Sequence, residues 1–153
     1  MSTQAIDQKC GGTPPFQTND ELRRTTVWKY IKTVDNPVDT EKIGRTYGWP
    51  IGKWDVSKLE DFSHVFYDRC STFNEDISEW STSRATTMYG MFWMASSFNQ
   101  PVGDWNTSNV RYMASMFCGA TCFNQPLTDW DIISRVHIIR LACFGMPPAS
   151  TSR

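Results

Sequence analysis

The sequence predicts an α/β fold, a short solenoid of about four coils in which each coil has one short extended segment and one helix. Two observations predict it. Tryptophan recurs at spacings of 26, 25 and 25 residues, at Trp54, Trp80, Trp105 and Trp130. In the first three units, apolar residues at helical spacing follow the tryptophan. Because a unit of this size cannot bury its apolar face alone, such units stack around a shared core.

The first half of each unit is predicted to be extended. An aromatic residue stands seven places before each tryptophan, and an aliphatic residue stands three places before it. These residues are Tyr47, Phe73, Phe98 and Phe123, and Ile51, Ile77, Val102 and Leu127. Prolines at positions 50, 101 and 126 disfavour a helix in this segment.

The second half of each unit is predicted to be a helix of about three turns. Serine and threonine after the tryptophan supply an oxygen for the free N–H groups of a first helical turn. The sequon Asn106-Thr107-Ser108 belongs to such a helix start and would matter as a glycosylation site only in a secretory setting. The apolar stripe of the third unit comprises Val110, Met113, Met116, Phe117 and Ala120.

Equivalent side chains of stacked coils are expected to lie above one another as structural ladders. Asparagine follows the aromatic residue in three units, and we expect these amides to be buried and to bond to backbone groups at one corner of each coil. We assign the repeated residues to ladders rather than to ligand binding: Phe73, Phe98 and Phe123; Asn74, Asn99 and Asn124; Trp54, Trp80, Trp105 and Trp130.

The repeats set the predicted domain boundaries. Residues 1–17 form an irregular arm, and residues 18–46 hold a capping helix near 19–33 and a connection. Leu22, Val27 and Tyr30 are expected on the buried side of that helix, with Trp28 at its margin. The repeat region is 47–146, with units starting near 47, 73, 98 and 123. Residues 147–153 are a loose tail.

Composition narrows the possible partners and compartments. The net charge of −1 does not support nucleic acid or an anionic membrane as partner. No stretch has the length and hydrophobicity of a signal peptide or a membrane span. An intracellular protein or part of a large assembly is therefore favoured, with a cell or virion surface left open. The odd number of cysteines, five, favours reduced thiols, with a Cys118–Cys143 disulfide as the alternative.

No motif indicates an enzyme, a metal site or a cofactor. The two histidines are His64 and His137, and no nucleophile signature surrounds any cysteine. A zinc site that combines His137 with Cys118, Cys122 and Cys143 is a weaker alternative. The acidic column Glu79, Asp104 and Asp129 provides too few oxygen ligands for calcium.

The repeat resembles that of the BspA-like leucine-rich-repeat surface proteins, with a pattern similar to F-N-x-x-(I/V/L)-x-x-W-x-x-S-x-V-x-x-M-x-x-M-F-x-x-A. Here it reads FNEDISEWSTSRATTMYGMFWMA and FNQPVGDWNTSNVRYMASMFCGA, after an opening segment YGWPIGKWDVSKLEDFSHVF. The resemblance covers roughly residues 47–144. It implies a right-handed leucine-rich-repeat-like solenoid and an interaction or surface scaffold without shared enzymatic chemistry. The fourth unit departs from it, because VHIIRLACF replaces the methionine stripe.

One predicted helix face points to partner binding. The positions ten, thirteen and fourteen after each tryptophan should face solvent, yet they carry few charges. Aromatic residues and methionine on an uncharged patch are typical of binding surfaces. We therefore predict a non-enzymatic protein–protein interaction or scaffold module, or a small subunit that contacts other protein subunits. The alternative is a glycan-binding module. The candidate contacts are Tyr67, Tyr89, Trp93, Met94, Tyr112 and Cys118.

Overall fold

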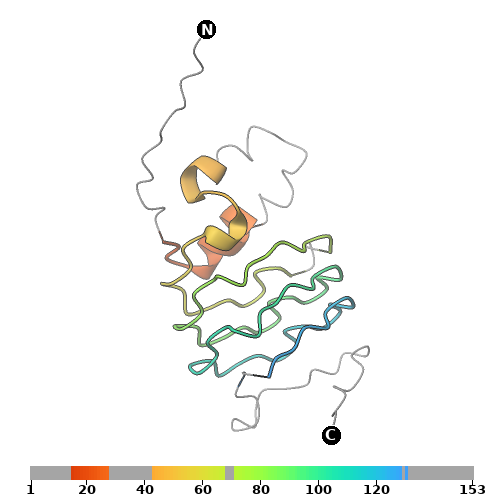
Figure 1. The fold of residues 1–153 in the computed structure, drawn as a ribbon. Helices are drawn as coiled ribbons and strands as arrows, with labels where there is room; N and C mark the ends of the chain where they lie inside the picture. The colour runs from red at the N-terminus through yellow and green to blue at the C-terminus, as the bar shows by residue number, and fades with distance from the viewer. Residues whose placement is uncertain (1–14, 28–42, 68–70, 129, 131–153) are drawn as a thin grey trace, which may run out of the picture.

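The computed structural model describes residues 15–27, 43–67, 71–128 and 130. In these ranges the helical elements are a π-helix, η1 (Glu21–Val27), and a 3-10 helix, η2 (Ile51–Lys53), and residues 19–20 and 43–47 are also helical. Figure 1 shows the repeats as coils stacked in chain order beside these helical segments. The predictions for residues 1–14, for Trp28 and Tyr30, and for the chain from 131 to 153 lie outside the described residues.

The predicted α/β fold class is wrong for the described residues. They contain no β-strand, and the pairing of extended chain is limited to isolated parallel bridges that join Asp61 to Thr87 and Thr87 to Tyr112. Where helices were predicted, as at 107–120, the chain forms turns and irregular segments. The coils are therefore built almost entirely from turns.

Left-handed backbone positions exclude the predicted helices. The φ angle is 58° at His64, 58° at Gly90 and 59° at Ser115, and each of these residues stands ten places after a repeat tryptophan. A right-handed helix requires a negative φ at every residue. Tight turns replace it, in which Met91 N–H donates to the Met88 carbonyl and Trp93 N–H to the Gly90 carbonyl. Three-residue turns place apolar side chains on one side at the same i, i+3 spacing that indicated a helix.

Backbone hydrogen bonds join each coil to the next. Three N–H groups of the first coil donate to carbonyls about 25 residues later: Phe62 to Thr87, His64 to Tyr89, and Phe66 to Met91. The same pattern repeats one coil further along, with Met88 to Tyr112, Gly90 to Ala114, and Phe92 to Met116. The coils thus satisfy their buried backbone groups between layers rather than within a helix.

Aromatic rings fill the interior of the stack. Phe66, Phe92 and Phe117 lie face to face, with ring centroids 5.2 and 5.4 Å apart and interplanar angles of 2° and 5°. Phe73, Phe98 and Phe123 form a second column with centroids 5.9 Å apart at both steps. The two columns touch each other, and all six rings are buried.

The repeat tryptophans link each coil to the coil before it. The indole N–H of Trp80 donates to the Ile51 carbonyl at 2.9 Å, and that of Trp105 donates to the Ile77 carbonyl at 3.3 Å. Trp130 makes the equivalent bond to Val102, whereas Trp54 bonds to Gly48. A buried indole needs such an acceptor. Tryptophan at this position therefore fills the core and also holds the spacing between coils.

The asparagine column joins the coils at the surface. Asn99 N–H donates to the Asn74 side-chain oxygen at 2.8 Å, and Asn124 N–H donates to that of Asn99 at 3.0 Å. Gln100 and Gln125 add side-chain bonds to the same asparagines. Asn74 and Asn124 are exposed, so the expected burial of this column is wrong. The asparagine side chains fix the register between coils, because each one accepts a bond from the backbone of the next coil.

The sequon region forms a turn instead of the predicted helix start. The Asn106 side-chain oxygen accepts bonds from the backbone N–H of Ser108 at 3.0 Å and from its hydroxyl at 2.7 Å. Asp55 and Ser57 make the equivalent backbone bond in the first unit. A short polar side chain that bonds to the backbone two residues later is an Asx turn. The polar residues after the tryptophan thus turn the chain.

An N-terminal segment covers the first coil with side chains. Asp61 and Ser63 of the first coil are equivalent to Thr87 and Tyr89 of the second coil. In the second coil, the carbonyls of Thr87 and Tyr89 accept N–H groups from the first coil. With no coil before them, the carbonyls of Asp61 and Ser63 both accept from the amide nitrogen of Asn19, at 3.0 Å each. Buried Phe16, Leu22 and Val27 complete this cap, and Phe16 stacks on Tyr47 with ring centroids 4.5 Å apart.

Replacing Asn19 with alanine is expected to lower the free energy of unfolding by about 1–2 kcal/mol, because two carbonyls lose their donor at once. Urea denaturation measures this loss. Asn109→Ala is the matched control, since the Asn109 amide makes one exposed bond, to the Ser83 carbonyl at 2.8 Å. An equal loss in the two variants would contradict the capping role of Asn19.

Candidate functional site

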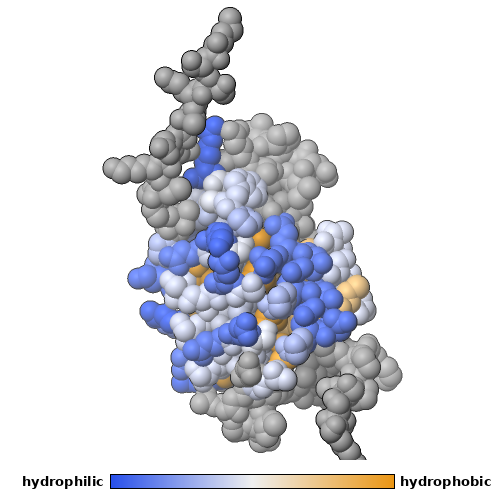
Figure 2. Space-filling model, viewed as in Figure 1, coloured by the Kyte–Doolittle hydropathy of each residue, from blue (hydrophilic) through white to orange (hydrophobic). Residues whose placement is uncertain are grey.

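Three of the six predicted contact residues are exposed hydrophobic side chains. Tyr89 is 39%, Met94 50% and Tyr112 63% exposed, and Trp49, outside the predicted set, is 47% exposed. The other predicted contacts, Tyr67, Trp93 and Cys118, are half-buried. Figure 2 colours the described part of one face mostly blue to white, with a few orange hydrophobic patches. The exposed aromatic side chains therefore belong to a largely polar surface.

The structure joins three of the predicted residues around a histidine. Tyr67 and Tyr89 each meet the His64 ring edge-on, with ring centroids 5.1 and 5.0 Å away. Trp93 lies 6.1 Å from His64 and 5.4 Å from Tyr67. We call His64, Tyr67, Tyr89 and Trp93 the aromatic cluster. The sequence placed His64, ten places after Trp54, on the same predicted face but did not name it as a contact.

Turns with left-handed residues position the cluster and its neighbour Met94. The φ angle of Met94 is 63°, and its N–H donates to the Cys118 carbonyl at 2.7 Å. Gly119, with φ 76°, lies under the methionine: a Cβ there would stand 2.5 Å from the Met94 sulfur. The missing side chain at Gly119 thus lets Met94 lie across the next coil beside Trp93.

Tyr112 lies apart from the cluster. Its backbone pairs with Thr87 and Met88 of the preceding coil. Within the described part of the chain, no ring contact joins its side chain to the aromatic cluster. Tyr112 therefore presents a separate exposed ring.

The His64 side chain combines burial with incomplete hydrogen bonding. Its Nδ1 atom is buried, and no described group lies in hydrogen-bonding geometry with it. Burial lowers the pKa of His64 below its usual 6.5, and the positive charge of Arg23 lowers it further. The Asp61 carboxylate and the nearby Gly90 backbone raise that pKa, but by less. The neutral imidazole is therefore the favoured form.

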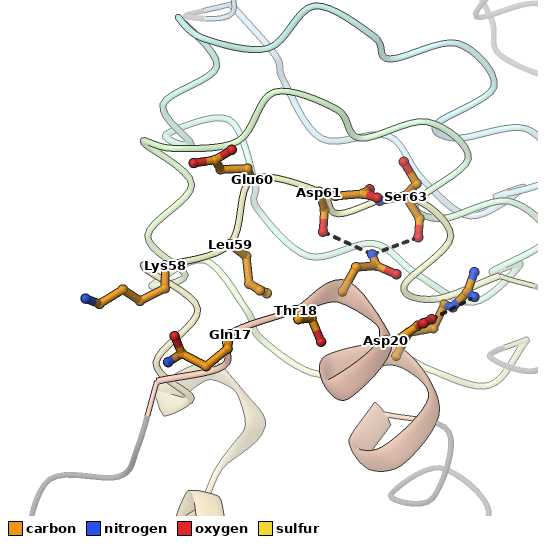
Figure 3. Close-up of a pocket in the computed structure, with 10 residues that line it drawn as sticks. Gln17, Thr18, Asp20, Lys58, Leu59, Glu60, Asp61 and Ser63 are labelled. Carbon is orange, nitrogen blue, oxygen red and sulfur yellow. Dashed lines mark hydrogen bonds and ion pairs between the residues drawn. The ribbon is translucent and has the colours of Figure 1, made fainter.

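An open groove of about 650 Å³ separates the N-terminal segment from the first coil. Figure 3 shows Asp61 and Ser63 of the first coil beside the N-terminal segment, and the Asn19 amide of that segment bonds to the carbonyls of both. Charged groups of both signs line the groove, and several are already paired, as in the ion pair of Glu60 with Arg84. The groove is the joint between cap and coil, and Asn19 of the cap bonds across it.

The described cysteines differ in their redox state. Cys118 is disulfide-bonded, so the expectation of reduced thiols is wrong for it. Cys122 is an exposed free thiol. Among the residues that the structure describes, no group of three or more His, Cys, Asp or Glu side chains could hold a metal ion. No helix in the same residues is long and apolar enough to cross a membrane.

Comparison with known proteins gives one family. The family model described as "Mycoplasma protein of unknown function, DUF285" matches residues 40–145, which is more than half of the chain. No curated protein and no solved structure matches. The matched region contains all the repeat tryptophans, and the match fits the resemblance to BspA-like surface repeat proteins.

Proposed function

The chain belongs to this DUF285 family, and on that premise we propose that it is a surface repeat module that binds another protein through the aromatic cluster and Met94. The observation that carries the proposal is the exposure of Tyr89 and Met94 together with the half-buried Trp93, which shares the His64 ring as a neighbour with Tyr89. Tyrosine, tryptophan and methionine are enriched where proteins meet. A cluster of such residues supplies the buried anchor that dominates binding energy.

The rigidity of the coils supports this role. Tyr89 and Trp93 lie on turns whose backbone groups bond to both neighbouring coils: the Tyr89 carbonyl accepts from His64, and Gly90 N–H donates to Ala114. A surface held in this way loses little conformational freedom when a partner binds. The side chains are therefore arranged for binding before the partner arrives.

A glycan-binding module is the second candidate, and Tyr112 is the observation that favours it. Its ring is the most exposed of the large hydrophobic side chains in the described residues. A free aromatic face can stack on the C–H groups of a sugar ring. In this case Tyr112, rather than the aromatic cluster, carries the contact.

Replacing Tyr89 with serine and Met94 with asparagine is expected to weaken partner binding about tenfold or more, as loss of anchor residues does. Asparagine is chosen because it tolerates the left-handed backbone at Met94. Proteins captured from native material by the immobilised wild-type chain are identified, and their affinities for each variant are measured.

The matched control is Trp49→Ser, which removes a comparably exposed ring outside the cluster. It should leave binding unchanged, and urea denaturation should show that all variants remain folded. If the double variant binds as tightly as the wild type, the proposed face is wrong. Glycan-array binding that is lost in Tyr112→Ser would favour the second candidate instead.

A further inference from the structure

The His64 ring is packed within the aromatic cluster, and its Nδ1 atom is buried. We propose that His64 is an acid-sensitive latch: protonation of its imidazole loosens the aromatic cluster. The proposal rests on the proposed function only for its consequence, that acid releases the partner. The latch itself is a property of the free chain.

The backbone holds the His64 ring in one place. His64 has a φ of 58°, a left-handed conformation that few residues other than glycine adopt. Its ring lies over Gly90 of the next coil, where an added Cβ would stand 2.7 Å from both Cε1 and Nδ1. Glycine at 90 leaves the room that the ring fills. The imidazole is therefore packed between its own turn and the next coil.

Three rings pack around the imidazole. Tyr67 and Tyr89 meet it edge-on, and Trp93 lies tilted against it. An imidazolium carries an N–H on both nitrogens. Nδ1 is buried and lies in hydrogen-bonding geometry with no described group, and the Gly90 backbone raises the pKa of His64 by less than burial lowers it. Acid therefore favours an open arrangement in which Nδ1 reaches water.

Two charged groups act on the ring from different elements. Arg23, on η1 (Glu21–Val27), repels a positive imidazole, whereas Asp61, on the first coil, attracts it. The Tyr67 and Tyr89 phenols also face the ring. Arg23 adds to the cost of a protonated imidazole.

The direction of the pH dependence follows from the lowered pKa of His64. The unfolded chain, with the ordinary histidine pKa of 6.5, binds the proton first as the pH falls. The stability that depends on neutral His64 is therefore complete above pH 6.5. It is lost as the pH falls from 6.5 through the lower pKa of the folded state.

The test is an NMR titration of the full chain between pH 8 and pH 4. The His64 Cε1–H resonance and the Trp93 indole N–H resonance are expected to change with one midpoint, below pH 6.5. The Trp93 signal is assigned by its loss in Trp93→Phe. In His64→Asn, which does not titrate in this range and tolerates the left-handed backbone, the Trp93 change should disappear. In the control His137→Asn it should remain.

The two neighbouring charges give a second test, with shifts of opposite sign. Arg23→Gln should raise the midpoint of His64, and Asp61→Asn should lower it. A Trp93 change that persists in His64→Asn, or that vanishes in His137→Asn, would overturn the latch. So would equal midpoints in the two charge variants. Because these measurements need no partner, a failure of the proposed binding function leaves their result interpretable.

Discussion

Replacing Phe92 with alanine is expected to lower the free energy of unfolding by about 3–5 kcal/mol, as truncation of a buried aromatic ring does. Phe92 is fully buried in the middle coil. Its ring stacks on Phe66 and Phe117 in the coils on either side and lies 4.0 Å from Phe98 between ring centroids. The cavity lies between three coils, and the backbone bonds that set their spacing limit collapse. Urea denaturation followed by circular dichroism measures the loss.

Tyr112→Ala is the control for this variant, because it removes an aromatic ring of similar size from the surface. Surface substitutions of this kind change stability by about 0.5 kcal/mol or less. A similar small loss in Phe92→Ala would mean that the rings do not carry the stability of the stack.

Replacing Gly52 with alanine is expected to destabilise the protein by about 1–3 kcal/mol, the usual range for an overpacked site. A Cβ on Gly52 would stand 2.4 Å from the Asp76 backbone oxygen in the next coil. This oxygen belongs to the backbone, so it cannot rotate away as a side chain would. The added methyl group must therefore push the first two coils apart. A lowered urea midpoint is the expected measurement.

Ser78 provides the matched control, because it stands two places before its tryptophan, as Gly52 does. The second coil accommodates a side chain there, so Ser78→Ala should cost less than Gly52→Ala. Hydrogen bonds from the Ser78 backbone N–H and, to a lesser extent, from its hydroxyl hold the pKa of Asp76 below its usual value. Ser78→Ala removes only the hydroxyl, so its cost should be limited to that weaker bond. If Gly52→Ala is as stable as the wild type, the coils can separate freely at this corner.

The apolar spacing predicted which residues are buried but not the backbone that buries them. Met88, Met91, Phe92 and Ala95 are all fully buried, in agreement with the predicted inward stripe. The same spacing arises from a helix and from consecutive tight turns, since both return a side chain to one side every three or four residues. The left-handed backbone at His64, Gly90 and Ser115 distinguishes the turns from a helix. Because three different residue types adopt this conformation, no single residue type in the sequence predicts it.

The cap was predicted in part. The acidic residue after Thr18 and Asn19 indicated a helix start, and Leu22 and Val27 are buried as expected. The role of Asn19 could not be predicted, because it depends on the carbonyls of Asp61 and Ser63, more than 40 residues away. The burial of Phe16, in the predicted irregular arm, was also not predicted, because its ring stacks on Tyr47, which lies 31 residues later in the chain.

The aromatic cluster shows the same limit at the candidate site. The sequence indicated Tyr67 and Trp93 because they break the charge pattern of an ordinary solvent face, and Tyr89 because it flanks the apolar stripe. It did not indicate that His64 lies between them, since that contact requires the left-handed turn at 64 and the open space at Gly90. Tyr112, predicted for the same surface, presents its ring separately.

By itself, the sequence determined the 25-residue period, the columns of phenylalanine, asparagine and tryptophan, and the family to which the chain belongs, because side-chain type and spacing are local properties. Only the tertiary structure decided that the coils are made of turns, that Asn19 caps the first of them, and that His64 lies within the aromatic cluster. These features depend on where N–H and carbonyl groups find partners in a neighbouring coil. These hydrogen-bond partners lie in different coils, so the sequence of one repeat does not specify them.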